Sequence, residues 1–486
     1  MESISLAVAG GFRIVVPGHP KHLSTYVFLE FEDWMEDEAP FLRQLFGAGE
    51  RVLDIGANLG FYSLTAARLA GPEGRIWAFE PTPEVARRLR ASIALNAMTT
   101  VEVVQCALGD RRGTARLARA MSSELNRIVD AAEEGEDVAL DTLDHWSAET
   151  PAARGISFVK LDVEGQEDAV IAGGRDFFSS ESPVVMMEVT EDAARVAAAM
   201  GRLRSLGYAS YRLLPELGIL APLAGSRTDQ FTYNLFLAKP DRAEALLARG
   251  RLMHAPEPAE PAPAAAMAAF ILGLAAIAPH RDGFGTTFAK LDPAGAYGTA
   301  LRSYVASRDA TRSPSARAAA LLMAHDAAEA ALAERASVPR LLSAGRIARA
   351  AGFREKAVAA AQKLAAALMQ GAPMTIGEPF LPMLPDYETW VSPAGLQGWI
   401  GAMVIEARWR WEGSSTYFHN ADFAKHDPVA LLRRFGREAP FFERRRVLNA
   451  WIEKKPVQPH PMLLRHAPDN LNPEYWSGQP VPAVTA

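Results

Sequence analysis

The sequence has little cysteine and no surplus of positive charge. Its 486 residues include one cysteine, Cys106, so an internal disulfide is impossible and a disulfide-stabilised extracellular scaffold is excluded. The 51 lysines and arginines are outnumbered by 57 aspartates and glutamates, which leaves a formal net charge of −6. Nucleic-acid-binding surfaces are usually basic, so we expect no nucleic-acid partner.

Long hydrophobic runs are also missing. The longest apolar run covers 264–278, about 15 residues, whereas a helix that spans a membrane needs about 20. This run consists mostly of alanine, and we predict a buried helix there. The first residues show no basic segment ahead of a sustained apolar stretch, so no secretory signal is expected. The single cysteine and the lack of a signal-like start together favour the cytoplasm, a reducing compartment, as the expected location.

The first half of the sequence alternates strand patterns with helix patterns. Residues 51–54 and 75–80 have the pattern of short strands, and residues 62–69 and 83–96 that of helices. Further strands are predicted at 101–105, 156–162, 184–188 and 233–238. Strands that alternate with helices form a mostly parallel sheet covered on both faces, so a doubly wound α/β fold is predicted.

A change of composition near residue 250 predicts a domain boundary. Residues 254–263 are rich in proline and alanine and cannot sustain a regular helix. We predict an α/β domain over 1–250, a linker over 251–265 and a mainly helical domain over 266–486. Within the last, 341–368 resembles one tetratricopeptide helix pair. We find no second copy, so an ordinary alanine-rich hairpin is the alternative.

A glycine-containing turn follows the first of these strands. Residues 54–60 read DIGANLG, and such a turn lets the backbone approach a ligand while the next helix directs N–H groups toward it. A dinucleotide site needs G-x-G-x-x-G. Here Asn58 replaces the middle glycine and Phe61 the last, so the phosphate-binding pattern fails.

Two acidic residues flank this turn. Asp54 stands two positions before Gly56, where a carboxylate can pair with the ammonium group of S-adenosylmethionine. Glu80 ends the second strand about twenty residues after Gly60, where a carboxylate can accept both ribose hydroxyls. One strand-helix-strand unit consumes that spacing. With Asn58, these residues are predicted to bind S-adenosylmethionine.

Six sequence blocks carry a resemblance to a known family. They are LDIGANLGFYSL, WAFEPTPEVARRLRASIALN, CALGD, LDTLD, FVKLDVEGQE and VVMMEV. In order and spacing, residues 51–189 resemble the FkbM family of S-adenosylmethionine-dependent methyltransferases. The resemblance implies a class I methyltransferase fold, cytoplasmic action and O-methylation, often of sugars or secondary metabolites. It does not extend to the C-terminal half.

Three further residues are candidates for the cofactor pocket. Pro81 is expected to shape the turn after Glu80. Asp110 follows the third strand, where this fold commonly contacts adenine, but its setting GDRRG is equally that of a solvated turn. Cys106, at the same strand end, is more consistent with a small core residue.

The candidate catalytic residues lie at the end of the fourth strand. Alternation along the strand places Lys160, Asp162 and Glu164 on one side, which can face the cleft at the carboxyl edge of the sheet. We predict Asp162 as the base that takes a proton from an acceptor hydroxyl, with Glu164 second. Alternatively, Lys160 merely pairs with a carboxylate, and Glu164 favours the first turn of the next helix.

A divalent metal would suit the carboxylates Asp162, Glu164 and Glu188. Because their spacing matches no diagnostic motif, we predict no metal. Acceptor specificity is expected from residues 121–126 and from the segment before residue 50. Candidate residues in that segment that could cover the cleft are Tyr26, Glu30 and Trp34.

Two classes of function remain in competition. One is a methyltransferase that acts on a sugar, glycan or secondary metabolite, and the other is a non-catalytic protein that binds partners through its helical domain. The helical domain could bind a protein partner, position a polymeric substrate or form a homodimer, and the sequence does not choose among these.

Overall fold

The structure is a computed structural model. It describes residues 2–118, 127–129, 135–190, 192–223, 232–253, 259–412, 415, 417 and 428–478, with 127–129 and 281–282 described by their backbone. The predicted specificity loop, 121–126, lies outside these residues.

A mixed sheet forms the centre of the first half. Among the described residues it has eight strands in the order β13-β12-β14-β11-β10-β3-β4-β5. The parallel strands are β3 (Arg51–Ile55), β4 (Arg75–Phe79), β5 (Val101–Val104), β10 (Phe158–Leu161) and β11 (Val184–Glu188). The antiparallel strands are β12 (Ala209–Leu214), β13 (Ile219–Pro222) and β14 (Asn234–Ala238). The predicted α/β fold is confirmed, and β12 and β13 add an antiparallel edge that was not expected.

Both faces of this sheet are covered because successive side chains point to opposite sides. Val52 of β3 belongs to one hydrophobic core and Leu53 to another. The first core packs under α1 (Leu23–Phe31), α2 (Glu38–Leu45), α3 (Phe61–Ala70) and α4 (Pro83–Leu95). The second packs under α5 (Leu143–Glu149), α6 (Glu167–Ala172), α7 (Arg175–Ser180) and α8 (Ala193–Ser205). The strand order reverses between the parallel neighbours β3 and β10, because β4 and β5 follow on one side of β3 while β10 and β11 lie on the other. Ligands bind at such switch points in open α/β sheets.

Smaller elements surround this sheet. A hairpin of β1 (Ser3–Val8) and β2 (Phe12–Pro17) precedes α1. A second sheet has the order β6-β9-β7-β8. Its strands are β6 (Ala107–Leu108), β7 (Gly113–Ala118), β8 (Arg127–Val129) and β9 (Glu136–Asp141). Helix α9 (Pro240–Ala248) follows β14 and ends this half.

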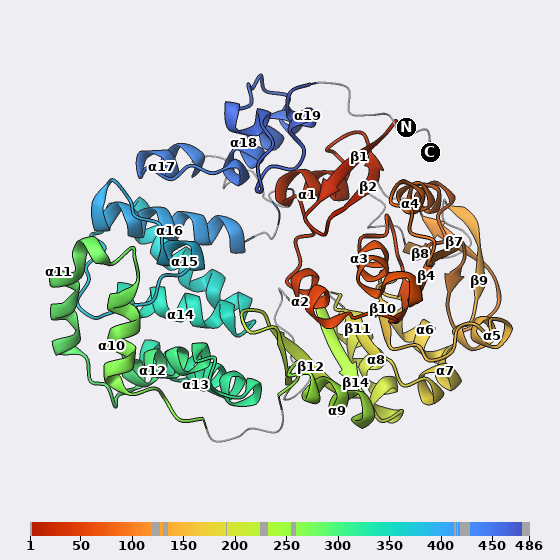
Figure 1. The fold of residues 1–486 in the computed structure, drawn as a ribbon, viewed down its shortest axis with the longest axis horizontal. Helices are drawn as coiled ribbons and strands as arrows, with labels where there is room; N and C mark the ends of the chain where they lie inside the picture. Colours follow the sequence, from red (N-terminus) through yellow and green to blue (C-terminus); the bar gives the residue numbers. More distant parts are fainter. Residues whose placement is uncertain are drawn as a thin grey trace.

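The second half is helical (Figure 1). Its α-helices are α10 (Ala264–Gly273), α11 (Arg281–Gly285), α12 (Ala296–Arg308), α13 (Pro314–Glu334), α14 (Val338–Ala350), α15 (Arg354–Met369), α16 (Gly395–Trp411), α17 (Pro428–Arg434), α18 (Pro440–Ile452) and α19 (Pro473–Trp476). Helices α14 and α15 occupy the segment that resembles a tetratricopeptide pair. They pack on each other, on α13 and on α16.

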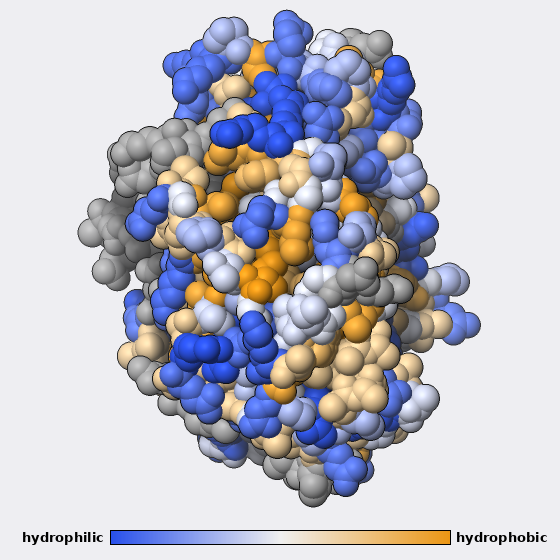
Figure 2. Space-filling view, turned by 90° about the vertical axis from the view of Figure 1, so that its left-hand side faces the viewer, coloured by the Kyte–Doolittle hydropathy of each residue, from blue (hydrophilic) through white to orange (hydrophobic). Residues whose placement is uncertain are grey.

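The apolar run at 264–278 differs from the prediction of a buried helix. The helix in it, α10, ends at Gly273, and within this fully described helix only Met267 and Ile271 are buried. Alanine is small enough to leave a helix face exposed at little cost. Figure 2 shows the side of the molecule that α10 and α11 occupy in Figure 1, with hydrophobic residues at the surface among hydrophilic ones. No described helix is both long and apolar enough to cross a membrane.

The end of the chain returns to its beginning, where α18 and α19 lie beside α1 and β1 (Figure 1). Arg445 and Glu30 form an ion pair of 2.5 Å in which both side chains are fully buried. The Tyr26 hydroxyl donates a hydrogen bond to Asn449 (2.6 Å), and the Ala7 N–H donates one to Asn472 (2.7 Å). The expectation that Tyr26 and Glu30 cover the cleft is therefore wrong, because these side chains hold the C-terminal segment instead.

Candidate active site

The glycine turn brings the backbone of β3 against the end of β10. Gly56 has φ of +83°, and a Cβ placed there would lie 1.7 Å from the carbonyl oxygen of Asp162. Gly60 has φ of +90°, and its Cβ would lie 2.1 Å from Leu89 of α4. Asn58 also has positive φ, 50°. The turn needs both glycines for its conformation and for these close approaches.

A cavity of about 300 Å³ opens at this turn, at the carboxyl ends of β3, β4 and β10. Eight of the predicted site residues line it: Gly56, Asn58, Gly60, Glu80, Pro81, Lys160, Asp162 and Glu164. The described residues that line it do not include the other two, Asp54 and Asp110. The cavity therefore unites the predicted cofactor and catalytic residues at one edge of the sheet.

Asp54 lies beneath the turn rather than in the cavity. Asp54 is 1% exposed. One of its carboxylate oxygens accepts a hydrogen bond from the Ser63 hydroxyl (2.6 Å). The other oxygen is buried and accepts no hydrogen bond from any residue that the structure describes. Burial raises the pKa of Asp54. In this arrangement Asp54 joins the turn to α3, and direct pairing with a ligand in the cavity is not possible without movement.

Asp110 lies outside the cavity for a simpler reason. Its side chain is 53% exposed and makes an ion pair of 3.3 Å with Arg111, which is 74% exposed. The solvated-turn alternative describes this geometry better than an adenine contact.

Glu80 is held by the turn itself. Its two carboxylate oxygens accept backbone hydrogen bonds from Asn58 (3.0 Å) and Thr82 (2.8 Å). Burial raises the pKa of Glu80 to about 7. Each oxygen retains acceptor capacity beyond one hydrogen bond, so this carboxylate can accept a pair of vicinal hydroxyls.

A cluster of charged groups at the end of β10 also lines the cavity. The Lys160 ammonium contacts Asp162 at 2.6 Å and lies over the Tyr62 ring, 5.1 Å from its centre. Burial opposes the charge on Lys160, but the carboxylates of Asp162 and Asp54 outweigh it and raise the pKa of Lys160. Lys160 therefore stays cationic and fixes Asp162 in place.

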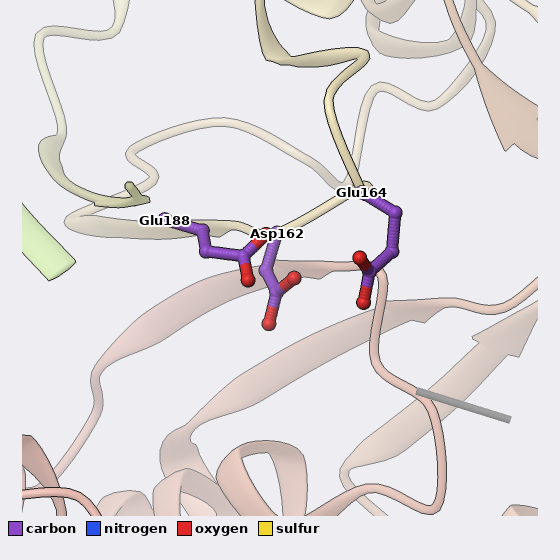
Figure 3. Close-up of side chains that lie close together, drawn as sticks. All are labelled: Asp162, Glu164 and Glu188. Carbon is purple, nitrogen blue, oxygen red and sulfur yellow. The ribbon is translucent and has the colours of Figure 1, made fainter. Parts of the chain in front are cut away.

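Two more carboxylates lie next to Asp162. One oxygen from each of Asp162, Glu164 and Glu188 falls within 4.8 Å of the others, and Figure 3 shows the three side chains directed to the same side. Burial, followed by repulsion from Asp162 and Glu164, raises the pKa of Glu188 to about 11. Glu188 therefore holds a proton at neutral pH. The three oxygens are also spaced so that they could hold a divalent cation.

The sequence missed one acidic residue in the wall of this cavity. Glu36 accepts hydrogen bonds from the Tyr62 hydroxyl (2.5 Å) and the Asn234 amide (2.9 Å). Burial raises the pKa of Glu36. Glu36 lies before residue 51, where the predicted alternation of strands and helices begins, so nothing in the neighbouring sequence identifies it as a site residue. Trp34, expected to cover the cleft, lines the same cavity, and so does Cys106, which was expected in the core.

Comparison with known proteins assigns the part of the chain that builds this cavity. A family model described as the methyltransferase FkbM domain matches residues 54–213. Over these residues the chain is similar to that family. The strand order and the cavity at the switch point agree with the class I methyltransferase fold that this family implies.

Individual relatives resemble part of the chain. Methyltransferase 1 of Beauveria bassiana is 27% identical over an alignment of 202 residues, which covers 37% of this chain and 78% of that protein. The 31-O-demethyl-FK506 methyltransferase FkbM of Streptomyces tacrolimicus is 29% identical over 191 residues, 33% of this chain and 73% of that protein.

A solved structure, methyltransferase FkbM from Methylobacillus flagellatus KT, is 16% identical and covers 44% of this chain with a TM-score of 0.29. This chain spans about half of that one, 53%. The Beauveria and Streptomyces relatives each align with less than half of this chain, so the similarity concerns only one part of it.

Proposed function

We propose that this protein transfers the methyl group of S-adenosylmethionine to a hydroxyl oxygen of a sugar, glycan or secondary metabolite. The observation that carries the proposal is a single cavity that joins the Gly56–Gly60 turn and Glu80 to the carboxylate cluster of Asp162. The FkbM domain supports a methyl transfer. The name of the Streptomyces relative supports oxygen as the methylated atom.

The turn and Glu80 are proposed to bind the methyl donor. Glu80 accepts the two ribose hydroxyls, while Gly56 and Gly60 give the turn the conformation that places its backbone on the cavity wall. Asn58 and Pro81 complete that wall of the cavity. Asp54 acts indirectly, since its hydrogen bond with Ser63 holds the turn against α3.

Asp162 is proposed to accept the proton that the acceptor hydroxyl loses. In this step a bond forms between the acceptor oxygen and the methyl carbon, the sulfur–methyl bond breaks, and S-adenosylhomocysteine leaves. Lys160 orients Asp162 through the 2.6 Å contact, and protonated Glu188 lowers the negative charge around it. Alignment of nucleophile and methyl carbon can itself contribute up to about 7–11 kcal/mol in well-oriented systems.

Calorimetry and a turnover assay test this proposal. We expect the protein to bind S-adenosylmethionine, and we expect Asp162→Asn to retain binding while release of S-adenosylhomocysteine falls by at least about 100-fold. Asp168→Asn, which alters a partly exposed ion pair with Arg202 outside the cavity lining, is the control and should retain both. Without binding at millimolar ligand the proposal fails, and a partner-binding protein on this fold becomes the better explanation.

A further inference from the structure

The residues proposed to bind the methyl donor do not include a partner for its ammonium group. Glu80 serves the ribose hydroxyls, and the ammonium group at the opposite end of the ligand requires a carboxylate in the same cavity. The sequence predicts Asp54 for this role, but Asp54 is not among the described residues that line the cavity. One of its oxygens is engaged by the Ser63 hydroxyl (2.6 Å) beneath the turn. We therefore expect the partner among the other acidic residues of the cavity wall.

The two sides of the cavity differ in charge. The described lining residues from the segment after β5 are uncharged, namely Cys106, Ala107, Leu108 and Leu117. On the other side of β3, where β10, β11 and β14 lie, the lining residues include Lys160, Asp162, Glu188 and Asn234. Glu80 follows β4 and lies between these two sides. With the ribose at Glu80, the neutral purine of the ligand suits the uncharged side, and its amino-acid end suits the charged side.

Glu36 lines the charged side of the cavity, in the connection between α1 and α2. The Tyr62 hydroxyl (2.5 Å) and the Asn234 amide (2.9 Å) both donate to its Oε2 atom, which leaves acceptor capacity on Oε1. These two donors are neutral. Lys160, whose charge also acts on Glu36, forms its ion pair with Asp162 instead (2.6 Å). The hydrogen bonds therefore hold Glu36 in place without supplying a countercharge.

The other acidic residues of the charged side are engaged with one another or with Lys160. Asp162 is paired with Lys160. Glu188 holds a proton, because burial and repulsion from Asp162 raise its pKa to about 11. Glu164 belongs with these two carboxyl groups to the cluster of oxygens within 4.8 Å of one another. Among the described residues that line this side, Glu36 is the acidic one outside that cluster.

A bound cation would favour the ionised form of Glu36. Burial raises the pKa of Glu36, whereas the Tyr62 hydrogen bond and the charge of Lys160 lower it. The positive charge of an ammonium group at Oε1 would lower this pKa further. Glu36 would therefore meet the ligand as a carboxylate.

The second half of the chain holds the segment that carries Glu36. Asp37, the next residue, forms an ion pair with Arg349 of α14 at 2.6 Å. Glu36 also lines a second cavity of about 110 Å³, whose wall includes Gly352 of the turn between α14 and α15. A Cβ placed at Gly352 would lie 2.6 Å from the carbonyl oxygen of Leu213, so this turn lies directly against the sheet. A carboxylate held in this way binds a cation with little further loss of side-chain freedom.

We propose that Glu36 binds the ammonium group of the methyl donor. This inference rests on the proposed function, because it concerns the same ligand in the same cavity. The ammonium group donates a charge-assisted hydrogen bond to the carboxylate. The second half of the chain then takes part in donor binding, because Arg349 holds the segment that carries Glu36.

Two ligands that differ only at the amino group test the proposal on the full-length protein. One is S-adenosylhomocysteine, and the other is its desamino analogue, in which a hydrogen atom replaces the amino group. By calorimetry at pH 8, we expect the analogue to bind the unmodified protein at least about tenfold more weakly than S-adenosylhomocysteine does. Equal affinities would overturn the proposal, because the ammonium group would then have no partner in the protein.

Variants identify the partner. Glu36→Gln should weaken the binding of S-adenosylhomocysteine at least about tenfold and should bind the two ligands with similar affinity, since both changes remove the same contact. Glu73→Gln, at an exposed position before β4, is the control and should keep the difference between the ligands. Unchanged affinity in Glu36→Gln would overturn the proposal. So would a Glu164→Gln variant that abolishes the difference while Glu36→Gln keeps it, because the cluster would then bind the ammonium group.

Hydrogen exchange on the unmodified protein gives a measurement that does not depend on a variant folding. At saturation, S-adenosylhomocysteine should slow amide exchange in 33–38 more than its desamino analogue does, and equal slowing by the two ligands would overturn the proposal. Failure of S-adenosylhomocysteine to bind the unmodified protein would contradict the proposed function itself. Binding of both ligands with equal affinity would overturn this inference alone, so the two failures are distinguishable.

Discussion

Lowering the pH from 8 to 5.5 should weaken the binding of S-adenosylhomocysteine, because Glu80 must be ionised to accept both ribose hydroxyls well. Burial raises the pKa of Glu80 to about 7, so free protein at pH 5.5 holds a proton on this carboxyl. At 1.5 pH units below that pKa only about 3% of the molecules carry the carboxylate, which predicts about 30-fold weaker binding, equivalent to about 2 kcal/mol.

The product is a better probe than the methyl donor, because it lacks the sulfonium charge. Calorimetry at half-unit steps from pH 5.5 to 8.5 should give an affinity that rises about tenfold per unit below pH 7 and levels off above it. In Glu80→Gln the affinity should be nearly independent of pH and, at pH 8, about tenfold or more below that of the unmodified protein. Glu149→Gln, at an exposed position, is the control and should follow the unmodified protein.

A flat affinity in the unmodified protein over this range would refute the reasoning, because it would mean that Glu80 does not bind the ligand as a carboxylate. A pH dependence that persists unchanged in Glu80→Gln would assign it to another group.

Three further predictions concern stability and are measured by urea unfolding. Gly56→Ala should lower the free energy of unfolding by about 3 kcal/mol or more, since its Cβ would meet a carbonyl oxygen at 1.7 Å, whereas Gly47→Ala, with open space, should change it little; similar losses in both would contradict the close approach. The pKa of Glu188 in the folded protein, about 11, lies above its ordinary 4.5, so the free energy of unfolding falls as the pH rises above 4.5. Glu188→Gln should remove at most about 4 kcal/mol of the fall between pH 5 and 8. An unaltered pH dependence in this variant would show that Glu188 is not protonated. Arg445→Met should cost about 3–5 kcal/mol by leaving Glu30 buried without its partner, and adding Glu30→Gln should recover part of that loss; an additive double variant would argue against the pair.

The parallel strands and the position of the cavity at their carboxyl ends could be predicted from the sequence. Local spacing is sufficient for this, because a strand, a glycine turn and a helix within a few residues determine where the backbone faces a ligand. Gly56, Gly60 and Glu80 meet at the carboxyl edge of the sheet for that reason.

Other parts of the site depend on contacts between distant segments, which local spacing cannot encode. Asp54 has the sequence position of a ligand-binding residue, but its side chain is buried and hydrogen-bonded to Ser63 of α3. Glu36 reaches the cavity from a segment outside the strand-helix alternation, where Tyr62 and Asn234 hold it.

The second half of the chain shows the same division most clearly. Its composition predicts helices, because alanine-rich segments favour helix whatever surrounds them. Two features of this half follow only from packing between distant segments. Arg445, near the end of the chain, pairs with Glu30 near its start. Gly352 lets a turn between two helices lie against the sheet and line a cavity there. The sequence by itself determined most of the elements and where the cavity lies, because both follow from local spacing, whereas the tertiary structure decided which charges are buried, which are matched, and that the helical half lines a second cavity beside the sheet.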